Sequence, residues 1–379
     1  MTASSISHKN LMNFSRMLDD TTNSYKIIFL QSLINLIEEF SCHERVVISL
    51  RELAVEMAVI AWYPHKFFRL SLGVQDQLSS ILDRIDTSSN DLGNKSFAKK
   101  DDVRSLIDIQ YERIGLKSVL KYVPYRLLTP FLESELRGRK DSEKNSLIEH
   151  LSSELYNTSE PSLYRFIKGV DGLIEVHPLW VNYIANTQPF IKGWIKSSWV
   201  QYLQARNKNI PAVVYKAYMP LSRASLSKQR SYWSIYMESH DVRCIYSNDI
   251  VPHDNFALDH FVPWSFVCHD QIWNLIPVEM SVNSSKGNCL PAKKYLNKFV
   301  DQQLDLLAHF RRFNNKQSPN LIWNRCKESY ILDLGLKEAE LESNDTVIHS
   351  KLSGALDRML LLAAQSGFTP DWEFTLRSR

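Results

Sequence analysis

Apolar residues recur with a helical period over much of the chain. The stretch 24–40 is apolar on several sides, which predicts a largely buried helix. The run Ser49-Leu50-Arg51-Glu52 is a capping-box pattern and predicts a second helix to about Trp62, with Pro64 ending it. The segment 66–70 mixes aromatic and basic residues. It fits either a nucleic-acid stacking surface or part of the core, and the core is the commoner use of such residues.

Further helical patterns follow toward the C-terminus. Residues 180–203 predict a helix with a break at Pro189, and a helix running to about Glu238 is predicted to begin at residues 220–223. Residues 291–313 predict a long amphipathic helix with Pro291 in its first turn, and two shorter helices are expected at 321–336 and 352–364. Alternation of apolar and polar residues at 173–177 predicts a strand.

The pattern changes between residues 255 and 290. One apolar run ends in Asp259-His260, a second run covers residues 273–278, and a short helical stretch starts near Ser281. This order predicts strand, loop, strand and helix. The fold class is therefore expected to be α+β, with a mainly helical N-terminal domain (residues 1–205), a central domain (206–313) and a small helical C-terminal region (314–379).

Polar residues at fixed spacings lie in this central segment. Asn274 follows His260 by fourteen residues, Asn283 follows nine residues later, and Lys286 three residues after that. A carboxylate beside an imidazole, with an amide oxygen from a following segment, suits a hard cation and a general base. Mg²⁺ takes oxygen ligands and keeps several waters, so one or two protein oxygens are enough. A neutral histidine close to such an ion can accept a proton from water near pH 7.

This segment resembles an HNH nuclease domain, or ββα-metal finger. Its spacings are similar to those of the HNH domains of RNA-guided CRISPR effectors, whose first motif residue is also Asp. The resemblance implies that Asp259 and Asn283 hold the metal, and that His260 is the general base. It further implies that Asn274 orients His260 through a hydrogen bond and that Lys286 faces the substrate phosphates.

Charge is balanced over the 379 residues. The formal net charge is only +3, which excludes a polybasic tail protein, and 44% hydrophobic residues are ample for packed cores. Basic residues are nevertheless concentrated between Lys196 and Arg243, where eight of them stand against two acidic ones. The residues expected to contact the nucleic-acid backbone, besides Lys286, are Arg223, Lys228, Arg230, Lys293 and Lys294.

Cysteine usage argues against a structural zinc. Many HNH proteins brace the finger with a zinc held by two C-x-x-C pairs. Cys244 lies where the first pair would be, but Ser247 replaces its partner, and none of the five cysteines forms such a pair. Scattered cysteines fit a reducing cytosol. The polar start of the sequence and the absence of a long apolar run predict a cytoplasmic protein without membrane insertion.

The sequence therefore predicts a metal-dependent HNH endonuclease that cleaves double-stranded DNA, with Mg²⁺ as cofactor and Mn²⁺ able to substitute. Because the sequence contains a single finger, with one metal site and one base, we expect the protein to cut one DNA strand at a time, as a nickase. Similar helical-plus-HNH proteins occur in bacterial defence and in mobile elements, and in a phage-defence role other proteins of the system would be partners. The rival interpretation is a nucleic-acid-binding or partner-sensing module whose finger no longer cuts, and RNA is a weaker alternative substrate.

Overall fold

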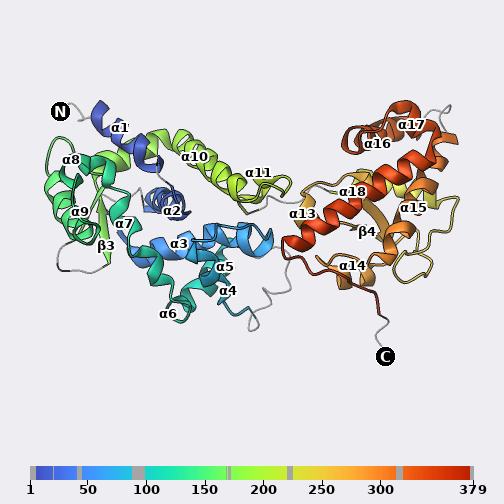
Figure 1. The fold of residues 1–379 in the computed structure, drawn as a ribbon, viewed down its shortest axis with the longest axis horizontal. Coiled ribbons are helices and arrows are strands. Elements are labelled where there is room, and N and C mark those ends of the chain that lie inside the picture. Colours follow the sequence, from blue (N-terminus) through green and yellow to red (C-terminus); the bar gives the residue numbers. More distant parts are fainter. Residues whose placement is uncertain are drawn as a thin grey trace. The chain divides into compact units, whose positions relative to one another are not determined.

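The computed structural model describes residues 6–19, 21–40, 45–87, 99–167, 169, 172–219, 225–312 and 319–375. The chain divides into two compact units (Figure 1). The first unit comprises Met1–Lys208 and Val213–Pro220, and the second comprises residues 209–212 and 221–379. None of the described helices is long and apolar enough to cross a membrane.

The first unit is built mainly from helices. Its longer helices are α1 (His8–Ser15), α2 (Tyr25–Phe40), α3 (Leu50–Trp62), α5 (Lys100–Ile109), α9 (Asp141–Leu155) and α10 (Pro178–Arg206). Shorter helical pieces are η1 (Arg16–Leu18), η2 (Tyr63–Phe67), α4 (Gln77–Asp83), α6 (Tyr111–Ile114), η4 (Leu116–Leu120), α7 (Val123–Arg126), η5 (Thr129–Leu132), α8 (Glu133–Leu136) and α11 (Val213–Lys216).

The predicted helices α2 and α3 form the centre of this unit. Most of α2 is buried, and α3 and α10 both pack against it. The capping box that starts α3 is formed, because the Ser49 hydroxyl accepts from the Glu52 amide and the Glu52 carboxylate accepts from the Ser49 amide. After α3 the chain continues into the short π-helix η2. Phe68 and Leu70, which follow it, are each 1% exposed, so residues 66–70 contribute to the core.

The predicted break at Pro189 is wrong, because α10 runs through it without interruption. Proline removes one backbone donor, and the carbonyl that it leaves free must find another partner. Pro189 is exposed, so water can reach this turn. The hydroxyl of Thr187 donates to the Tyr183 carbonyl at 2.7 Å, and the amide of Asn186 donates to the Asn182 carbonyl at 2.8 Å. The carbonyl that Pro189 leaves free is that of Ala185, four residues earlier, which is also exposed, so water is its available partner.

A small antiparallel sheet completes the first unit. The predicted strand at 173–177 is β3 (Leu173–Val176), which pairs with β1 (Val46–Ser49) on one side and β2 (Tyr164–Phe166) on the other. Glu175 faces Val47 and Arg165 in this register. Its carboxylate, 5% exposed, accepts hydrogen bonds from Arg45 and Arg165, so charged groups link the three strands.

The second unit contains the expected strand, loop, strand and helix. Antiparallel β4 (Ala257–His260) and β5 (Leu275–Val278) are followed by α14 (Met280–Lys286), which confirms the α+β fold. The other elements are α12 (Ser227–Met237), α13 (Trp264–Val267), η6 (Ile272–Asn274), α15 (Lys294–Arg312), α16 (Pro319–Leu334), α17 (Glu338–Ser343) and α18 (Asp345–Gln365). The amphipathic helix starts later than predicted, because Pro291 forms a bridge with Trp372 instead.

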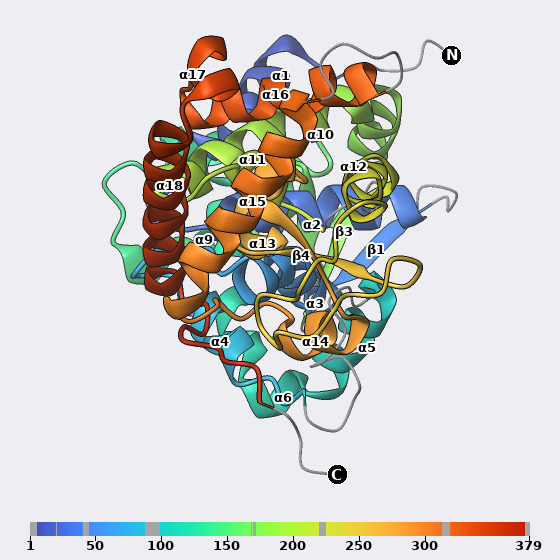
Figure 2. The ribbon, with the colours of Figure 1, turned by 90° about the vertical axis from the view of Figure 1, so that its right-hand side faces the viewer.

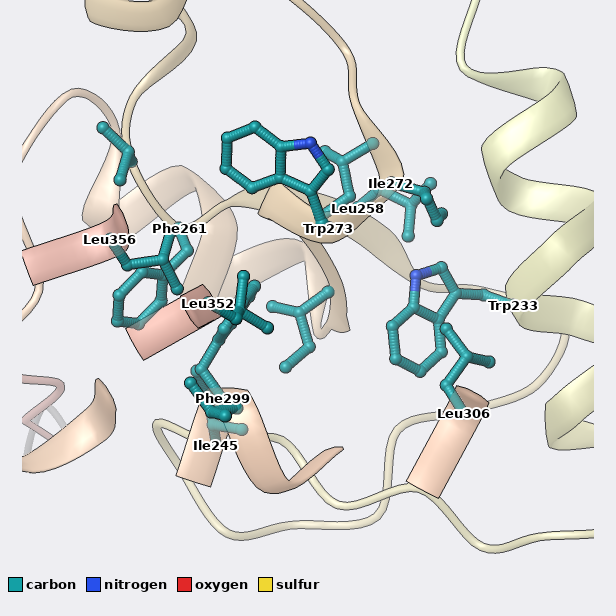
Figure 3. Packing of buried hydrophobic residues seen from close by; sticks show 14 of the residues in the cluster. Trp233, Ile245, Leu258, Phe261, Ile272, Trp273, Phe299, Leu306, Leu352 and Leu356 are labelled. Carbon is teal, nitrogen blue, oxygen red and sulfur yellow. The ribbon is translucent and has the colours of Figure 1, made fainter. Parts of the chain in front are cut away.

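One hydrophobic cluster holds the second unit together. It joins Trp233 of α12, Leu258 of β4 and Phe299 of α15 to Leu352 and Leu356 of α18 (Figure 3). Helices α15 and α18 lie side by side (Figure 2). The segment expected as a separate C-terminal region, residues 314–379, therefore contributes its described helices to the same core as the hairpin.

Candidate active site

The β4–β5 hairpin places Asp259 and His260 at the end of a buried strand. Asp259 pairs with Ile276 and His260 pairs with Leu275 in the antiparallel register. All eight residues of the two strands are buried, and α14 packs against β4. The two polar side chains therefore start from a rigid backbone, which is what a site of fixed geometry requires.

Both oxygens of the Asp259 carboxylate have a partner. Lys286 Nζ, from the last turn of α14, lies 3.0 Å from Oδ1, and the hydroxyl of Tyr246 donates to Oδ2 at 2.8 Å. Lys286 also donates to the His260 carbonyl at 2.7 Å and is 1% exposed. The lysine predicted to face substrate phosphates is thus buried and directed toward Asp259.

Tyr246 comes from a tight turn that precedes β4. The Cys244 amide donates to the Asp249 carbonyl at 2.8 Å, and Asn248 has the positive φ of 70° that closes the turn. The Tyr246 ring packs edge-on against Tyr295 and Trp372. Burial, reinforced by Asp259, raises its pKa well above the usual value near 10, so the phenol stays protonated and donates. The turn occupies the place where many HNH proteins carry the first C-x-x-C pair, and this position is the only signal in the sequence that points to Tyr246.

His260 is held through its Nε2 atom. This atom lies 2.9 Å from Asp270 Oδ1, in the loop between the two strands. His260 is 8% exposed, and its Nδ1 atom has no hydrogen-bond partner in the described part of the chain. A carboxylate that accepts from Nε2–H leaves the Nδ1 lone pair available for a proton. Asp270 was not predicted, although it is the one acidic residue in the connection 261–273.

Asn274 is fully buried and fixes the backbone beyond His260. Its side-chain amide donates to the Val262 carbonyl at 2.9 Å, and its side-chain oxygen accepts from the Val262 amide at the same distance. Its own carbonyl accepts from Phe261. The implied hydrogen bond from Asn274 to the imidazole is not formed among the described residues. Asn274 instead shapes the loop that leaves β4.

Asn283 lies on α14, three residues before Lys286. It is partly exposed, and its side chain forms no hydrogen bond within the described residues, so its amide oxygen is free to bind a ligand. A carboxylate from Asp259 with an amide oxygen from Asn283 fits a hard divalent ion that keeps several waters. The Lys286 ammonium already forms an ion pair with this carboxylate. Among the described residues no three His, Cys, Asp or Glu side chains gather into a metal site.

The basic residues expected at a nucleic-acid surface differ in their surroundings. Lys228 and Lys293 are exposed. Arg230 is also exposed, but it donates to the Phe256 carbonyl at 2.7 Å and lies over the Phe256 ring, so it ties α12 to the segment before β4. Lys294 pairs with Glu373 at 2.5 Å. Arg223 lies outside the described residues.

The helices after the finger support the loop and β5. Gln303 of α15 is fully buried and donates to the Leu275 carbonyl at 2.7 Å, and the Tyr330 hydroxyl of α16 donates to Gln303. The indole of Trp273 donates to Asp333 of α16 at 2.8 Å. His269 packs against Trp273, and burial lowers the pKa of its imidazole. These contacts hold the segment that carries Asp270.

Comparison with known families identifies the same segment. Residues 243–292 match a family model described as HNH endonuclease, a span that includes the Tyr246 turn, the hairpin and α14. No curated protein and no solved structure matches the chain.

Proposed function

We propose that this chain, whose residues 243–292 form an HNH endonuclease domain, is a metal-dependent endonuclease that hydrolyses phosphodiester bonds of DNA. The observation that carries the proposal is the arrangement at the end of β4. A buried carboxylate and an imidazole occupy adjacent residues, and the imidazole is held at Nε2 with Nδ1 unpaired among the described residues. A protein that only binds nucleic acid needs none of these groups.

His260 is the general base in this mechanism. Nδ1 takes a proton from water while the water oxygen forms a bond to phosphorus, and the bond from phosphorus to the 3′ oxygen breaks. The leaving oxygen takes a proton from solvent, which gives 5′-phosphate and 3′-hydroxyl ends, as the family resemblance implies. A divalent ion held by Asp259 and Asn283, Mg²⁺ or Mn²⁺, would supply charge neutralisation at the phosphate and the leaving oxygen.

DNA binding is assigned to exposed lysines of the second unit. Lys228 and Lys293 are exposed and have no ion-pair partner among the described residues, which leaves their charges available for phosphates. Lys286 would act on the phosphate only indirectly, through Asp259, because it is buried. Contacts of this kind neutralise the backbone without reading sequence.

The proposal extends to a biological setting. A cytoplasmic DNA nickase without strong sequence preference fits defence against phage, in which partner proteins would restrict its action to foreign DNA. The presence of genes for such partners next to this one would support that role.

The deciding experiment uses the whole chain, supercoiled plasmid and Mg²⁺. Wild-type protein is expected to cleave, and His260→Ala to lose about 10²–10⁴-fold of the rate, the usual contribution of a general base. His253→Ala is the matched control, because His253 is an exposed histidine of the same domain that pairs with Asp254. Activity of His260→Ala within a few-fold of wild type would reject the mechanism. Parallel assays on RNA test the substrate, and binding without cleavage by wild-type protein would favour a non-cutting module.

A further inference from the structure

We propose that Asp270 is the positioning residue of the reaction, which orients the His260 imidazole for proton transfer. The inference rests on the proposed nuclease function and adds a residue to it. The family resemblance implied that Asn274 does this work. The structure directs the hydrogen bonds of Asn274 to the backbone of Val262 instead, so the imidazole depends on another group.

The contact itself is short and sheltered. Nε2 of His260 lies 2.9 Å from Oδ1 of Asp270, and the two side chains are 9% and 20% exposed. A hydrogen bond shielded from water in this way is stronger than one at an open surface.

The loop that presents Asp270 is anchored independently of its carboxylate. The side-chain amide of Gln229, on α12, donates to the Asp270 backbone carbonyl at 2.9 Å. Cys268 adopts the left-handed conformation, with φ 56°, that ends α13 and turns the chain toward Asp270. Trp273, three residues further on, is tied to Asp333. Replacing the Asp270 side chain therefore leaves the loop's own attachments in place.

The chemistry explains why a carboxylate is useful here. By accepting from Nε2–H, Asp270 fixes the tautomer in which Nδ1 holds the lone pair. It also stabilises the positive charge that appears on the ring when Nδ1 takes the proton from water. Both effects act on the transition state more than on substrate binding, so the loss of Asp270 should lower kcat and leave KM nearly unchanged.

Two substitutions test this role. Asp270→Ala removes the acceptor, and Asp270→Asn keeps an oxygen acceptor without the charge. We expect kcat on plasmid to fall about 10–100-fold in Asp270→Ala, as is usual when a supporting partner is lost, and by less in Asp270→Asn. KM and Mn²⁺ affinity should stay within about two-fold, because neither depends on the imidazole tautomer. Asp254→Ala is the control, since it breaks an exposed His–Asp pair that also measures 2.9 Å.

A spectroscopic measurement separates positioning from a general loss of structure. In ¹⁵N NMR spectra of the imidazole, wild-type His260 is expected to show the Nε2–H tautomer, and Asp270→Ala a mixture of both tautomers with a folded spectrum elsewhere. If Asp270→Ala keeps wild-type kcat and tautomer while His260→Ala is inactive, the positioning role is wrong and the nuclease function stands. If His260→Ala is itself active, the nuclease mechanism fails first.

Discussion

Lys286 Nζ lies 3.0 Å from Asp259 Oδ1, and the two side chains are 0% and 3% exposed. Burying a charge is costly unless it is paired, so each of these groups depends on the other. Tyr246 completes the arrangement by donating to the second carboxylate oxygen. The carboxylate expected to hold a divalent ion is therefore compensated by the protein itself, and this makes the ammonium and the ion rivals for the same negative charge.

The first prediction concerns this pair. Lys286→Met keeps the length of the side chain but leaves Asp259 buried without a cation. We expect the free energy of unfolding in EDTA to fall by about 3–5 kcal/mol, the typical cost of removing one partner of a buried pair. Saturating Mn²⁺ should restore more stability to Lys286→Met than it adds to wild type, because the ion would supply the missing positive charge. Urea unfolding with EDTA and with Mn²⁺ measures both effects.

Lys293→Met provides the control for that comparison, because Lys293 is an exposed lysine of the same unit. Its stability should change by less than about 0.5 kcal/mol in either buffer. Equal losses in the two variants would mean that the Lys286–Asp259 pair contributes nothing specific.

The second prediction concerns the metal ligands. Asp259→Asn keeps the size of the side chain but removes its charge, so calorimetric titration with Mn²⁺ should show no binding. Asn283→Ala should weaken binding less, because a neutral amide oxygen contributes less than a carboxylate to holding a divalent ion. Unchanged affinity in both variants would place the metal elsewhere.

Local pattern predicted the elements that carry the site, and tertiary contacts determined the rest. Asp259, His260 and α14 could be located because apolar runs, spacing and a short helical stretch are properties of neighbouring residues. The partners Tyr246 and Asp270 could not, because each reaches the site through the path of a loop. The uninterrupted helix at Pro189 could not be predicted for a related reason, since the packing of α10 and the exposure of the turn to water outweighed a local propensity.

The third prediction concerns acid stability of the first unit. Hydrogen bonds and charge from Arg45 and Arg165 lower the pKa of Glu175 to about 2. A depressed folded-state pKa stabilises the fold above the unfolded value near 4.5, and this contribution is lost as the pH falls toward 2. Glu175→Gln should therefore be less stable than wild type at pH 6, by about 1.5–3 kcal/mol. Thermal unfolding should show this difference shrinking between pH 4.5 and 2.5, whereas a constant difference would contradict the linkage.

The last prediction concerns the number of strands cut. In the proposed mechanism one finger provides one base and one metal site, so we expect a single chain to break one phosphodiester bond in each binding event. Simultaneous cuts in both strands would need a symmetric dimer that places two fingers on opposite strands, and no heptad run in the sequence marks such a seam. Supercoiled plasmid should therefore become open-circular first and linear only as nicks accumulate. Because binding depends on phosphate contacts, the rate should fall steeply with salt. Linear DNA at the earliest times, with no open-circular intermediate, would show that two fingers act together.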